Sequence, residues 1–473
     1  MPVSFSLLLP ELSVCGWILV MLAADLCAPA AKRSGLWVLA LAGIVLCGWL
    51  LVGQAAPADG VSVQAMFRVD RFAQYFKLLF LLTTAVVVVM TRQFSHRFEA
   101  ATGSFYMLLF TALLGMLTLA SIDDLLMLFI GLELLTFSLY VMAAYLKTDA
   151  RSVEAGMKYL ILGSVSSGFL VYGIALLYGF AGSTSFSVIR EALSAQAPMT
   201  AQAGLVLVLA GLGFKVAAVP FHLWVPDVYE GAPTPVVALL SVGSKMAGIV
   251  AILRVLYGVF QPLAAFWTEL LAVIAAATML YGNLAAIPQR NIKRLLGYSS
   301  IGHAGYLLMG LSNGSAAGAV SVGYYLLAYL FSNLAAFLVV VTVSEALGSD
   351  QLDAYQGLSK RSGWLSAGLF IALLSLAGVP PLAGFFGKLL VLLATVEGGR
   401  LWLVAIGAVN VAISLYYYLM VVKRMYLDAP ASAAPVAVGG ITKLVLLALL
   451  LGILAVGVFQ APYLARITLA LSP

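Results

Sequence analysis

Runs of about 20 predominantly apolar residues recur along this chain from one end to the other. A helix of about 20 residues rises about 30 Å, which is the thickness of the hydrocarbon core of a bilayer. The chain is 63% hydrophobic and 9% charged, whereas soluble domains are roughly half apolar and a quarter charged. The sequence therefore excludes a soluble fold and predicts a protein that crosses a membrane many times.

The hydrophobic runs predict about 14 transmembrane helices, so we expect an all-α polytopic membrane protein. Gly, Ser and Ala are mixed with Leu and Val in these runs, which favours close helix packing over a lipid-facing β-barrel. No soluble domain or low-complexity linker interrupts them. The expected crossings are 7–25, 36–53, 70–90, 103–121, 124–146, 153–180, 201–219, 234–259, 266–288, 291–312, 316–347, 362–396, 401–426 and 441–462.

The net charge is +6, and its distribution predicts an orientation rather than a nucleic-acid partner. Basic residues gather in alternate loops, and the positive-inside rule places such loops in the cytoplasm. We therefore expect both termini on the opposite side, in the periplasm, with the chain in a bacterial inner membrane. The basic clusters are Lys32/Arg33, Arg92/Arg97, Lys147/Arg151, Arg290/Lys293/Arg294, Lys360/Arg361 and Lys423/Arg424.

Two segments in different spans place proline in the middle of apolar sequence. KVAAVPFHLW contains Pro220, and SLAGVPPLAGFFGK contains Pro380 and Pro381. Proline removes a backbone donor and clashes with the preceding turn, so each segment predicts a broken helix, in the seventh and twelfth spans. Paired broken helices that run in opposite directions indicate inverted repeats and a transport pathway. The alternative is two unrelated proline kinks.

Five ionisable residues stand in the middle of predicted spans, where a charge costs about 2.5–3.5 kcal/mol to insert. They are Glu133, Lys158, Lys215, Lys245 and Lys388. A chain that needed only to fold would carry leucine at these positions, so the residues indicate a function in transport. The alternative for each lysine is a snorkelling side chain or a structural ion pair, most of all for Lys158, which follows Glu154 by one turn. Lys77 is left out of the set because it can snorkel.

A buried lysine beside a carboxylate has the chemistry to exchange protons. Desolvation disfavours the charged form of an amine, and a neighbouring carboxylate favours it again. The hypothesis is that Glu133 and Lys215 form such a pair, with Lys245 and Lys388 as the next acceptors. Water held by hydroxyl groups would connect them.

Two histidines support this hypothesis without settling their roles. His303, in GYSSIGHAGYLLMG, stands where a relay needs a neutral, titratable group. A hydrogen-bonded structural histidine fits the same position. His222 follows the first proline break by two residues, where either a gate or a structural cap is expected. His96 is expected in a solvated loop.

The cysteine and histidine positions predict no resident cofactor. Cys15, Cys27 and Cys47 have the spacing of neither a disulfide framework nor a metal site. The three histidines lie far apart, so no haem or iron–sulfur ligand set is expected. No phosphate-binding loop is present. Any redox chemistry that drives this chain is therefore expected on other subunits.

The segment VPFHLWVPDVYEGAPTPVVALLSVGSK, from Val219 to Lys245, resembles the signature region of the antiporter-like subunits of respiratory complex I. Subunits L and M of that family tend to have a histidine-bearing segment after P-T-P-V, where this chain has L-L-S-V-G-S-K. The resemblance covers the whole chain in the number and order of spans.

The resemblance implies a single membrane domain, 1–473, with two inverted five-helix repeats. Helices 1–3 would occupy 1–100, the repeats 101–262 and 263–428, and the last helix 429–473. It places the proton path on Glu133, Lys215, Lys245 and Lys388, with supporting roles for Lys158, His222, His303, Pro220 and Pro380.

The resemblance also implies which groups lie elsewhere. NADH, FMN, the iron–sulfur clusters and the quinone are expected on partner subunits, with no cofactor in this chain. The expected partners are the lipid bilayer and membrane subunits of the M, K and J types. Two other functions stay open, namely a subunit of a multisubunit cation/proton antiporter and a membrane scaffold that does not transport.

Overall fold

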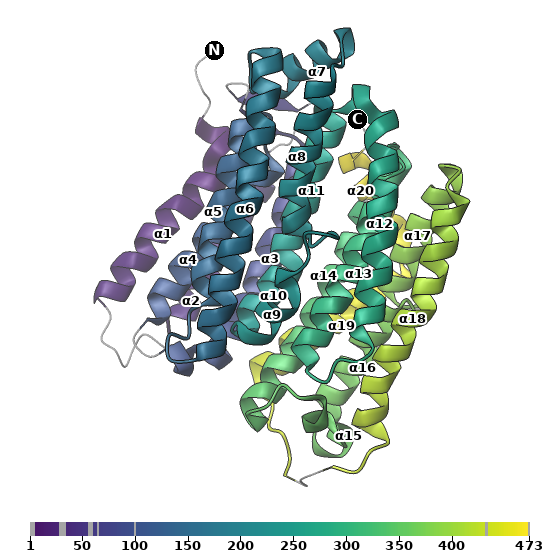
Figure 1. Ribbon diagram of the computed structural model, residues 1–473. Helices are drawn as coiled ribbons and strands as arrows, with labels where there is room; N and C mark the ends of the chain where they lie inside the picture. The colour runs from purple at the N-terminus through teal and green to yellow at the C-terminus, as the bar shows by residue number, and fades with distance from the viewer. Residues whose placement is uncertain are drawn as a thin grey trace. The chain divides into compact units, whose positions relative to one another are not determined.

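The computed structural model describes residues 5–27, 35–54, 60–63, 66–98, 101–430 and 434–471 (Figure 1). The predicted basic cluster Lys32/Arg33 lies outside these residues. The described chain is almost entirely helical, so the predicted all-α membrane fold is confirmed. It divides into two compact units. Unit 1 contains Met1–Val88, Ser95–Ala217 and Gly231–Trp267, and unit 2 contains Val89–Phe94, Ala218–Glu230 and Thr268–Pro473.

Unit 1 begins with three apolar helices and a small hairpin. The hairpin pairs Ser62 with Arg68 in antiparallel register. Asp70 then caps α3 by accepting a hydrogen bond from the Ala73 backbone N–H, which satisfies one of the free donors of the first turn. The elements are η1 (Phe5–Leu8), α1 (Leu9–Cys27), α2 (Leu36–Gly53), β1 (Val61–Val63), β2 (Phe67–Val69), α3 (Arg71–Phe94), which continues into unit 2, and η3 (Ser95–Phe98).

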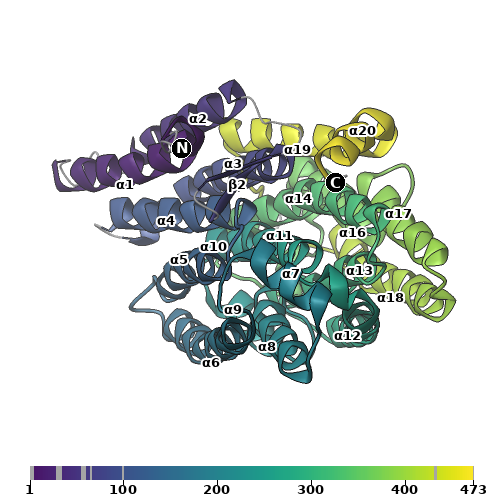
Figure 2. The same ribbon diagram turned by 90° about the horizontal axis from the view of Figure 1, so that it is seen from above.

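The rest of unit 1 is a bundle in which α4 packs on α5, α5 on α6 and α6 on α8, while α11 contacts both α4 and α8 (Figure 2). Asp124 caps α5 and Asp149 caps α6 through their side chains. The elements are α4 (Thr102–Ala120), α5 (Leu125–Ala143), α6 (Ala150–Ala181), α7 (Phe186–Ala195), α8 (Met199–Val216), α10 (Thr234–Leu239), the π-helical η4 (Leu240–Ser244), α11 (Lys245–Gly258) and η5 (Gln261–Leu263).

Unit 2 is built around α14, which contacts α13, α16, α17, α19 and α20. Asn291 caps α13 and Ser315 caps α14, which starts both helices at a side-chain acceptor. The elements are α9 (Trp224–Gly231), α12 (Ala264–Ala286, which begins in unit 1), α13 (Ile292–Leu311), α14 (Ala316–Leu347), η6 (Leu352–Tyr355), α15 (Leu358–Arg361), α16 (Gly363–Ala377), α17 (Ala383–Glu397), α18 (Leu401–Tyr426), α19 (Gly440–Val458) and α20 (Gln460–Leu471).

Both proline segments lie between helices. α8 ends at Val216 and α16 ends at Ala377, and a residue with left-handed backbone follows each end, Ala217 (φ 64°) and Gly378 (φ 89°). The left-handed residue stands three positions before Pro220 in one segment and three before Pro381 in the other. Pro220 therefore corresponds to Pro381 rather than to Pro380. The peptide bonds that precede Pro220 and Pro381 are both cis.

Twelve of the described helices are long and apolar enough to cross a membrane. α13 and the α16–α17 pair are not among the twelve, so the count of 14 crossings stays a prediction. The inverted relation of the two repeats and the boundaries at 100, 262 and 428 likewise stay predictions. The crossings expected near 291–312 and 362–396 correspond to α13 and to α16 with α17.

Candidate functional site

Lys215 lies in the last turn of α8, and its side chain is buried, as predicted, with 3% exposed. Its ammonium donates to the hydroxyl of Thr136 at 2.9 Å and to that of Tyr159 at 3.3 Å. The Tyr159 ring centroid lies 5.8 Å from the ammonium. Two neighbouring helices, α5 and α6, thus supply neutral oxygen atoms and an aromatic face to one buried amine of α8.

Glu133 occupies the turn of α5 before Thr136, and its carboxylate accepts a hydrogen bond from Ser167 of α6 at 2.5 Å. The Glu133 carboxylate and the Lys215 ammonium form no direct ion pair among the residues that the structure describes. The predicted Glu133–Lys215 pair is therefore indirect, with hydroxyl groups bonded to each member. Glu133 is half-buried, because its side of the α5–α6 surface is partly open.

Lys245 is buried, as predicted, and is the first residue of α11 after the π-helical turn. π-helical turns are rare and gather at functional sites. Gly248 lies one turn further along α11 and packs on α8, where an added Cβ would lie 3.3 Å from Cγ of Lys215 and 2.7 Å from Val216. This close approach brings the Lys245 turn of α11 beside the Lys215 turn of α8.

Lys388 lies in α17, and it too is buried, with 3% exposed. Its ammonium donates to the Ala377 carbonyl at 2.9 Å and to the Ser414 hydroxyl at 3.4 Å, and it lies 5.1 Å from the centre of the Tyr306 ring. Ala377 is the last residue of α16, so its carbonyl belongs to the negative end of the helix dipole. A helix end, a hydroxyl and an aromatic ring together balance this charge.

His303 is buried in α13 and touches a tyrosine on each side of its ring. Nδ1 lies 2.6 Å from the Tyr325 hydroxyl and Nε2 lies 3.1 Å from the Tyr418 hydroxyl. A neutral imidazole has one donor and one acceptor nitrogen, so it can take a proton on one side and release one on the other. Tyr418 continues the row with a short hydrogen bond to Ser299.

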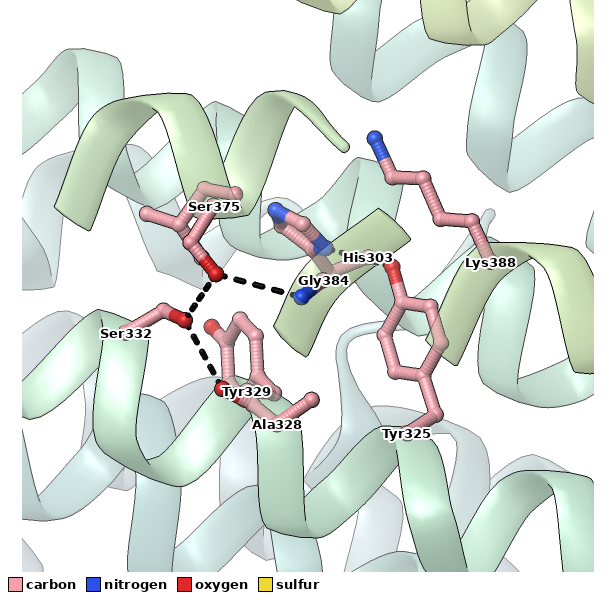
Figure 3. A pocket seen from close by; sticks show the side chains of 9 residues that line it. His303, Tyr325, Ala328, Tyr329, Ser332, Ser375, Gly384 and Lys388 are labelled. Atoms are coloured by element: carbon pink, nitrogen blue, oxygen red, sulfur yellow. Dashed lines mark hydrogen bonds between the residues drawn. The ribbon is translucent and has the colours of Figure 1, made fainter. Parts of the chain in front are cut away.

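A small cavity joins His303 to Lys388. Its volume has room for about one water molecule. Figure 3 shows the His303, Tyr325 and Lys388 side chains around it, with Ser332 and Ser375 on the opposite side. The Ser332 and Ser375 hydroxyls lie 2.7 Å apart, and Ser375 accepts the Gly384 N–H at 3.1 Å. The cavity is lined by His303, Tyr325, Ala328, Tyr329, Ser332, Ser375, Leu376, Gly384 and Lys388.

Two predicted supporting residues lie apart from these groups. Lys158 is 43% exposed and forms an ion pair with Glu154 at 2.7 Å on the outer face of α6. His222 is buried in the segment between α8 and α9, with its ring 4.2 Å from that of Tyr281, centre to centre. Pro220 and Pro380 stand in the helix interruptions themselves.

Lys77 was left out of the predicted set because a lysine at its position can snorkel, and the structure shows another reason to set it apart. Lys77 does not snorkel, because it is 1% exposed and its ammonium lies 2.5 Å from the carboxylate of Glu11, itself 7% exposed. A second ion pair was missed as well, between Arg254 and Asp70, with two hydrogen bonds of 2.7 Å. Nothing in the sequence pairs these residues, since 66 positions separate Glu11 from Lys77 and 184 separate Asp70 from Arg254.

The tyrosines and serines around His303 were also missed. A helical pattern could have indicated them, because Tyr325, Tyr329 and Ser332 are spaced i, i+4 and i+7 on one face of α14. Cys15, Cys27 and Cys47 are free thiols. Among the residues that the structure describes, no group of three or more His, Cys, Asp and Glu side chains could hold a metal ion.

The comparisons with known proteins point to one family. Residues 122–414 match the model of the NADH:quinone oxidoreductase/Mrp antiporter transmembrane family. The chain is 40% identical to NADH-quinone oxidoreductase subunit N of Desulfitobacterium hafniense, over 98% of this chain and 97% of that protein. A chain of respiratory complex I from Thermus thermophilus has 31% identity and a TM-score of 0.83, over 97% and 99% of the two chains.

A chain of the Mrp complex from Dietzia sp. shows the same fold, with a TM-score of 0.85 at 21% identity, over 99% of this chain and 97% of that one. The predicted resemblance is thereby confirmed over almost the full length. This chain belongs to the NADH:quinone oxidoreductase/Mrp antiporter transmembrane family, and its similarity to subunit N proteins is nearly end to end.

Proposed function

We propose that this chain carries protons across the membrane as a subunit of a redox-driven NADH–quinone oxidoreductase. The observation that carries the proposal is the hydrogen bonding of Lys215 and Lys388. Both amines are buried: Lys215 donates to two hydroxyls and Lys388 to a carbonyl and a hydroxyl, and neither is paired directly with an acid among the described residues. A hydroxyl accepts from an ammonium and donates to a neutral amine, so either protonation state stays hydrogen-bonded.

Each unit holds one part of the pathway. In unit 1 the groups are Glu133, Lys215 and Lys245, and Glu133 lies about one helical turn from Thr136, whose hydroxyl bonds to Lys215. In unit 2 they are His303 and Lys388, on either side of the cavity. The two parts correspond to the proposed repeats, 101–262 and 263–428. His222 and the interruptions at Pro220 and Pro380 would gate access, and Lys158 would act at the outer face of α6.

The open face of α5 and α6 is proposed to contact another membrane subunit. Glu133 and Ser167 lie partly open among exposed apolar side chains such as Phe137 and Val165. A carboxylate at the depth of a membrane helix is costly against lipid, so a protein partner is favoured there. Subunits of the M, K and J types are the proposed neighbours, and NADH, FMN, the iron–sulfur clusters and the quinone would be bound elsewhere in the assembly.

The orientation follows from the charges. Basic residues flank α13 and α18 at one end, at Arg290, Lys293, Lys423 and Arg424. The positive-inside rule assigns this end to the cytoplasm and both termini to the periplasm. The proposed location is a bacterial inner membrane.

The test is proton pumping by the purified assembly in proteoliposomes. The chain is expected to co-purify with flavin and iron–sulfur centres, and NADH oxidation is expected to acidify the vesicle interior. Lys388→Met should abolish pumping in an assembly of normal composition, while Lys443→Met, outside the proposed path, should leave it unchanged. Pumping by Lys388→Met at the wild-type rate would refute the proposal. Sodium-dependent flux without NADH would favour the cation/proton antiporter instead.

A further inference from the structure

A second row of hydroxyl groups in unit 2 leads to the Lys388 cavity from α9. Tyr329 of α14 lines the cavity (Figure 3), and its hydroxyl donates to Ser300 of α13 at 3.1 Å. The Ser300 oxygen lies 3.1 Å from the Tyr229 hydroxyl of α9. All three side chains are buried. Their hydrogen bonds therefore connect α9, α13 and α14 in the interior of the unit.

The far end of this row lies on α9, beside three charged residues that are partly exposed. Tyr229 is flanked on α9 by Asp227 and Glu230, whose carboxylates accept hydrogen bonds from Arg294 at 2.7 and 3.1 Å. The side chains of Asp227, Glu230 and Arg294 are 34%, 30% and 29% exposed. Tyr229, where the row begins, is thus next to Glu230 in the sequence and two residues after Asp227, and both carboxylates are partly exposed.

The packing around the row keeps its members close. An added Cβ at Gly297 would lie 3.3 Å from Cβ and Cδ1 of Tyr229, so the glycine lets the α9 tyrosine approach α13. Asn333 donates to the Tyr329 hydroxyl at 3.1 Å. This donor occupies one side of the phenolic oxygen and leaves the hydroxyl hydrogen to point toward Ser300 or toward the cavity.

We propose that Tyr229, Ser300 and Tyr329 form an entrance through which protons reach Lys388 from the exposed end of α9. This inference rests on the proposed function, since it names the route into one of its two parts. Asp227 and Glu230 collect protons at the mouth of the entrance. The end of α9 and the basic start of α13 lie together through the Arg294 bonds, which fits a cytoplasmic opening.

Each step of the transfer balances. A proton from a protonated carboxylic acid or hydronium at the mouth forms a new O–H bond on Tyr229 as the existing Tyr229 O–H bond breaks toward Ser300. The same exchange occurs at Ser300 and at Tyr329. A water molecule in the cavity receives the proton and passes it to the neutral amine of Lys388, where an N–H bond forms. The hydroxyl groups keep no net charge, no group is oxidised or reduced, and rotation of the hydroxyls resets the row.

The test uses the whole assembly in proteoliposomes, with the Tyr229→Phe, Tyr329→Phe and Ser300→Ala variants. Each removes one hydroxyl and keeps most of the packing. We expect pumping about fivefold slower, the equivalent of one lost hydrogen bond of about 1 kcal/mol, and a larger slowing in D₂O than in the wild type. Ser300→Thr keeps the hydroxyl and should restore pumping. Tyr324→Phe is the matched control, because Tyr324 is a buried α14 tyrosine whose hydroxyl bonds to the Val456 carbonyl outside the row.

Two results would overturn the entrance. One is pumping by Tyr229→Phe and Tyr329→Phe at the rate of Tyr324→Phe. The other is equal pumping by Ser300→Ala and Ser300→Thr, which also decides the question if a tyrosine variant does not assemble. Lys388→Met is measured alongside. If Lys388→Met stops pumping while the hydroxyl variants pump at the wild-type rate, the proposed entrance is wrong and the proposed function stands. If Lys388→Met also pumps normally, the proposed function itself fails.

Discussion

Lys77 and Lys215 of unit 1 are both buried but have different partners. Lys77 of α3 lies against the Glu11 carboxylate at 2.5 Å, whereas Lys215 of α8 is hydrogen-bonded to two hydroxyl groups and lies further from Glu133. A direct ion pair fixes the ammonium form, because loss of the proton would strand a buried carboxylate. Hydroxyl partners serve both forms of the amine. We propose that the direct partner, rather than burial, separates a structural lysine from a proton carrier.

Lys388 of unit 2 belongs with Lys215 in this comparison. Its partners are the Ala377 carbonyl and the Ser414 hydroxyl, and His303 lines the same cavity. Asp70 and Arg254, in contrast, resemble Glu11 and Lys77, because charge meets charge directly through two hydrogen bonds. The comparison therefore separates Glu11–Lys77 and Asp70–Arg254, in which opposite charges meet directly, from Lys215 and Lys388, which are bonded to neutral groups.

The largest effect is expected for Lys77→Met, which leaves the Glu11 carboxylate buried and unpaired. We expect it to lower the free energy of unfolding in detergent by about 3–5 kcal/mol. The double variant Glu11→Gln/Lys77→Met should recover most of the loss. Complexes that still assemble should pump at the wild-type rate, and a loss of pumping at normal stability would break the comparison.

Lys215→Met should have the opposite profile. Removal of a positioned acid–base group is expected to slow pumping about 10²-fold, while the unfolding free energy stays near that of the wild type because the apolar stem is kept. Lys215→Arg sharpens the result, since guanidinium stays protonated and should also fail to pump. Normal pumping by either variant, measured in proteoliposomes, would remove Lys215 from the path.

The Asp70–Arg254 pair predicts a pH-dependent stability. Burial alone raises the pKa of Asp70, but the Arg254 charge and hydrogen bonds outweigh it, and the net pKa is lowered from its usual value. The pair therefore stabilises the fold above about pH 4, and this stabilisation is lost as the pH falls through the lowered pKa. Asp70→Asn should lower the free energy of unfolding by about 2 kcal/mol at pH 7. In thermal unfolding measured over a series of pH values, it should also weaken the loss of stability at acid pH.

Asp123 is the matched control for this series, because burial raises the pKa of its carboxyl. A raised pKa gives stability below the ordinary value that is lost as the pH rises, so Asp123→Asn should not remove the acid transition. An acid transition that survives Asp70→Asn and disappears in Asp123→Asn would contradict the assignment.

The smallest effect is expected for Thr136→Val, which removes one hydroxyl from Lys215 and keeps the side-chain shape. Loss of a hydrogen bond of about 0.5–1 kcal/mol predicts pumping about threefold slower. Thr84→Val is the control, because Thr84 is a buried threonine of α3 that bonds only to the Phe80 carbonyl of its own helix. Equal rates for the two variants would show that the hydroxyl on Lys215 has no part in transport.

The sequence was sufficient for the membrane fold and for the burial of Lys215, Lys245 and Lys388. Both follow from local properties, namely the length of apolar runs and the cost of a charge within them. The sequence could not predict which buried charges form ion pairs with each other. Glu11 and Lys77 lie on different helices, α1 and α3, and only the folded structure reveals that they form an ion pair.

The hydroxyl groups around His303 could likewise be predicted only in part from the sequence. The i, i+4, i+7 spacing of Tyr325, Tyr329 and Ser332 defines a polar face of α14, which the sequence does contain. The partners of that face, such as Tyr418 and Ser300, come from helices whose neighbours the sequence does not specify. For Lys158 the partner is close in sequence. The spacing of one helical turn indicated an ion pair with Glu154 as the alternative to a role in transport, and the structure contains that ion pair.

The most direct test compares Glu11→Gln with Glu133→Gln, the same chemical change at a directly paired and an indirectly paired glutamate. The measurement is the number of protons pumped per electron by each assembled complex in proteoliposomes. We predict a wild-type ratio for Glu11→Gln, with reduced thermal stability, and a ratio that falls for Glu133→Gln at unchanged stability. A normal ratio for Glu133→Gln together with a reduced one for Glu11→Gln would contradict the account.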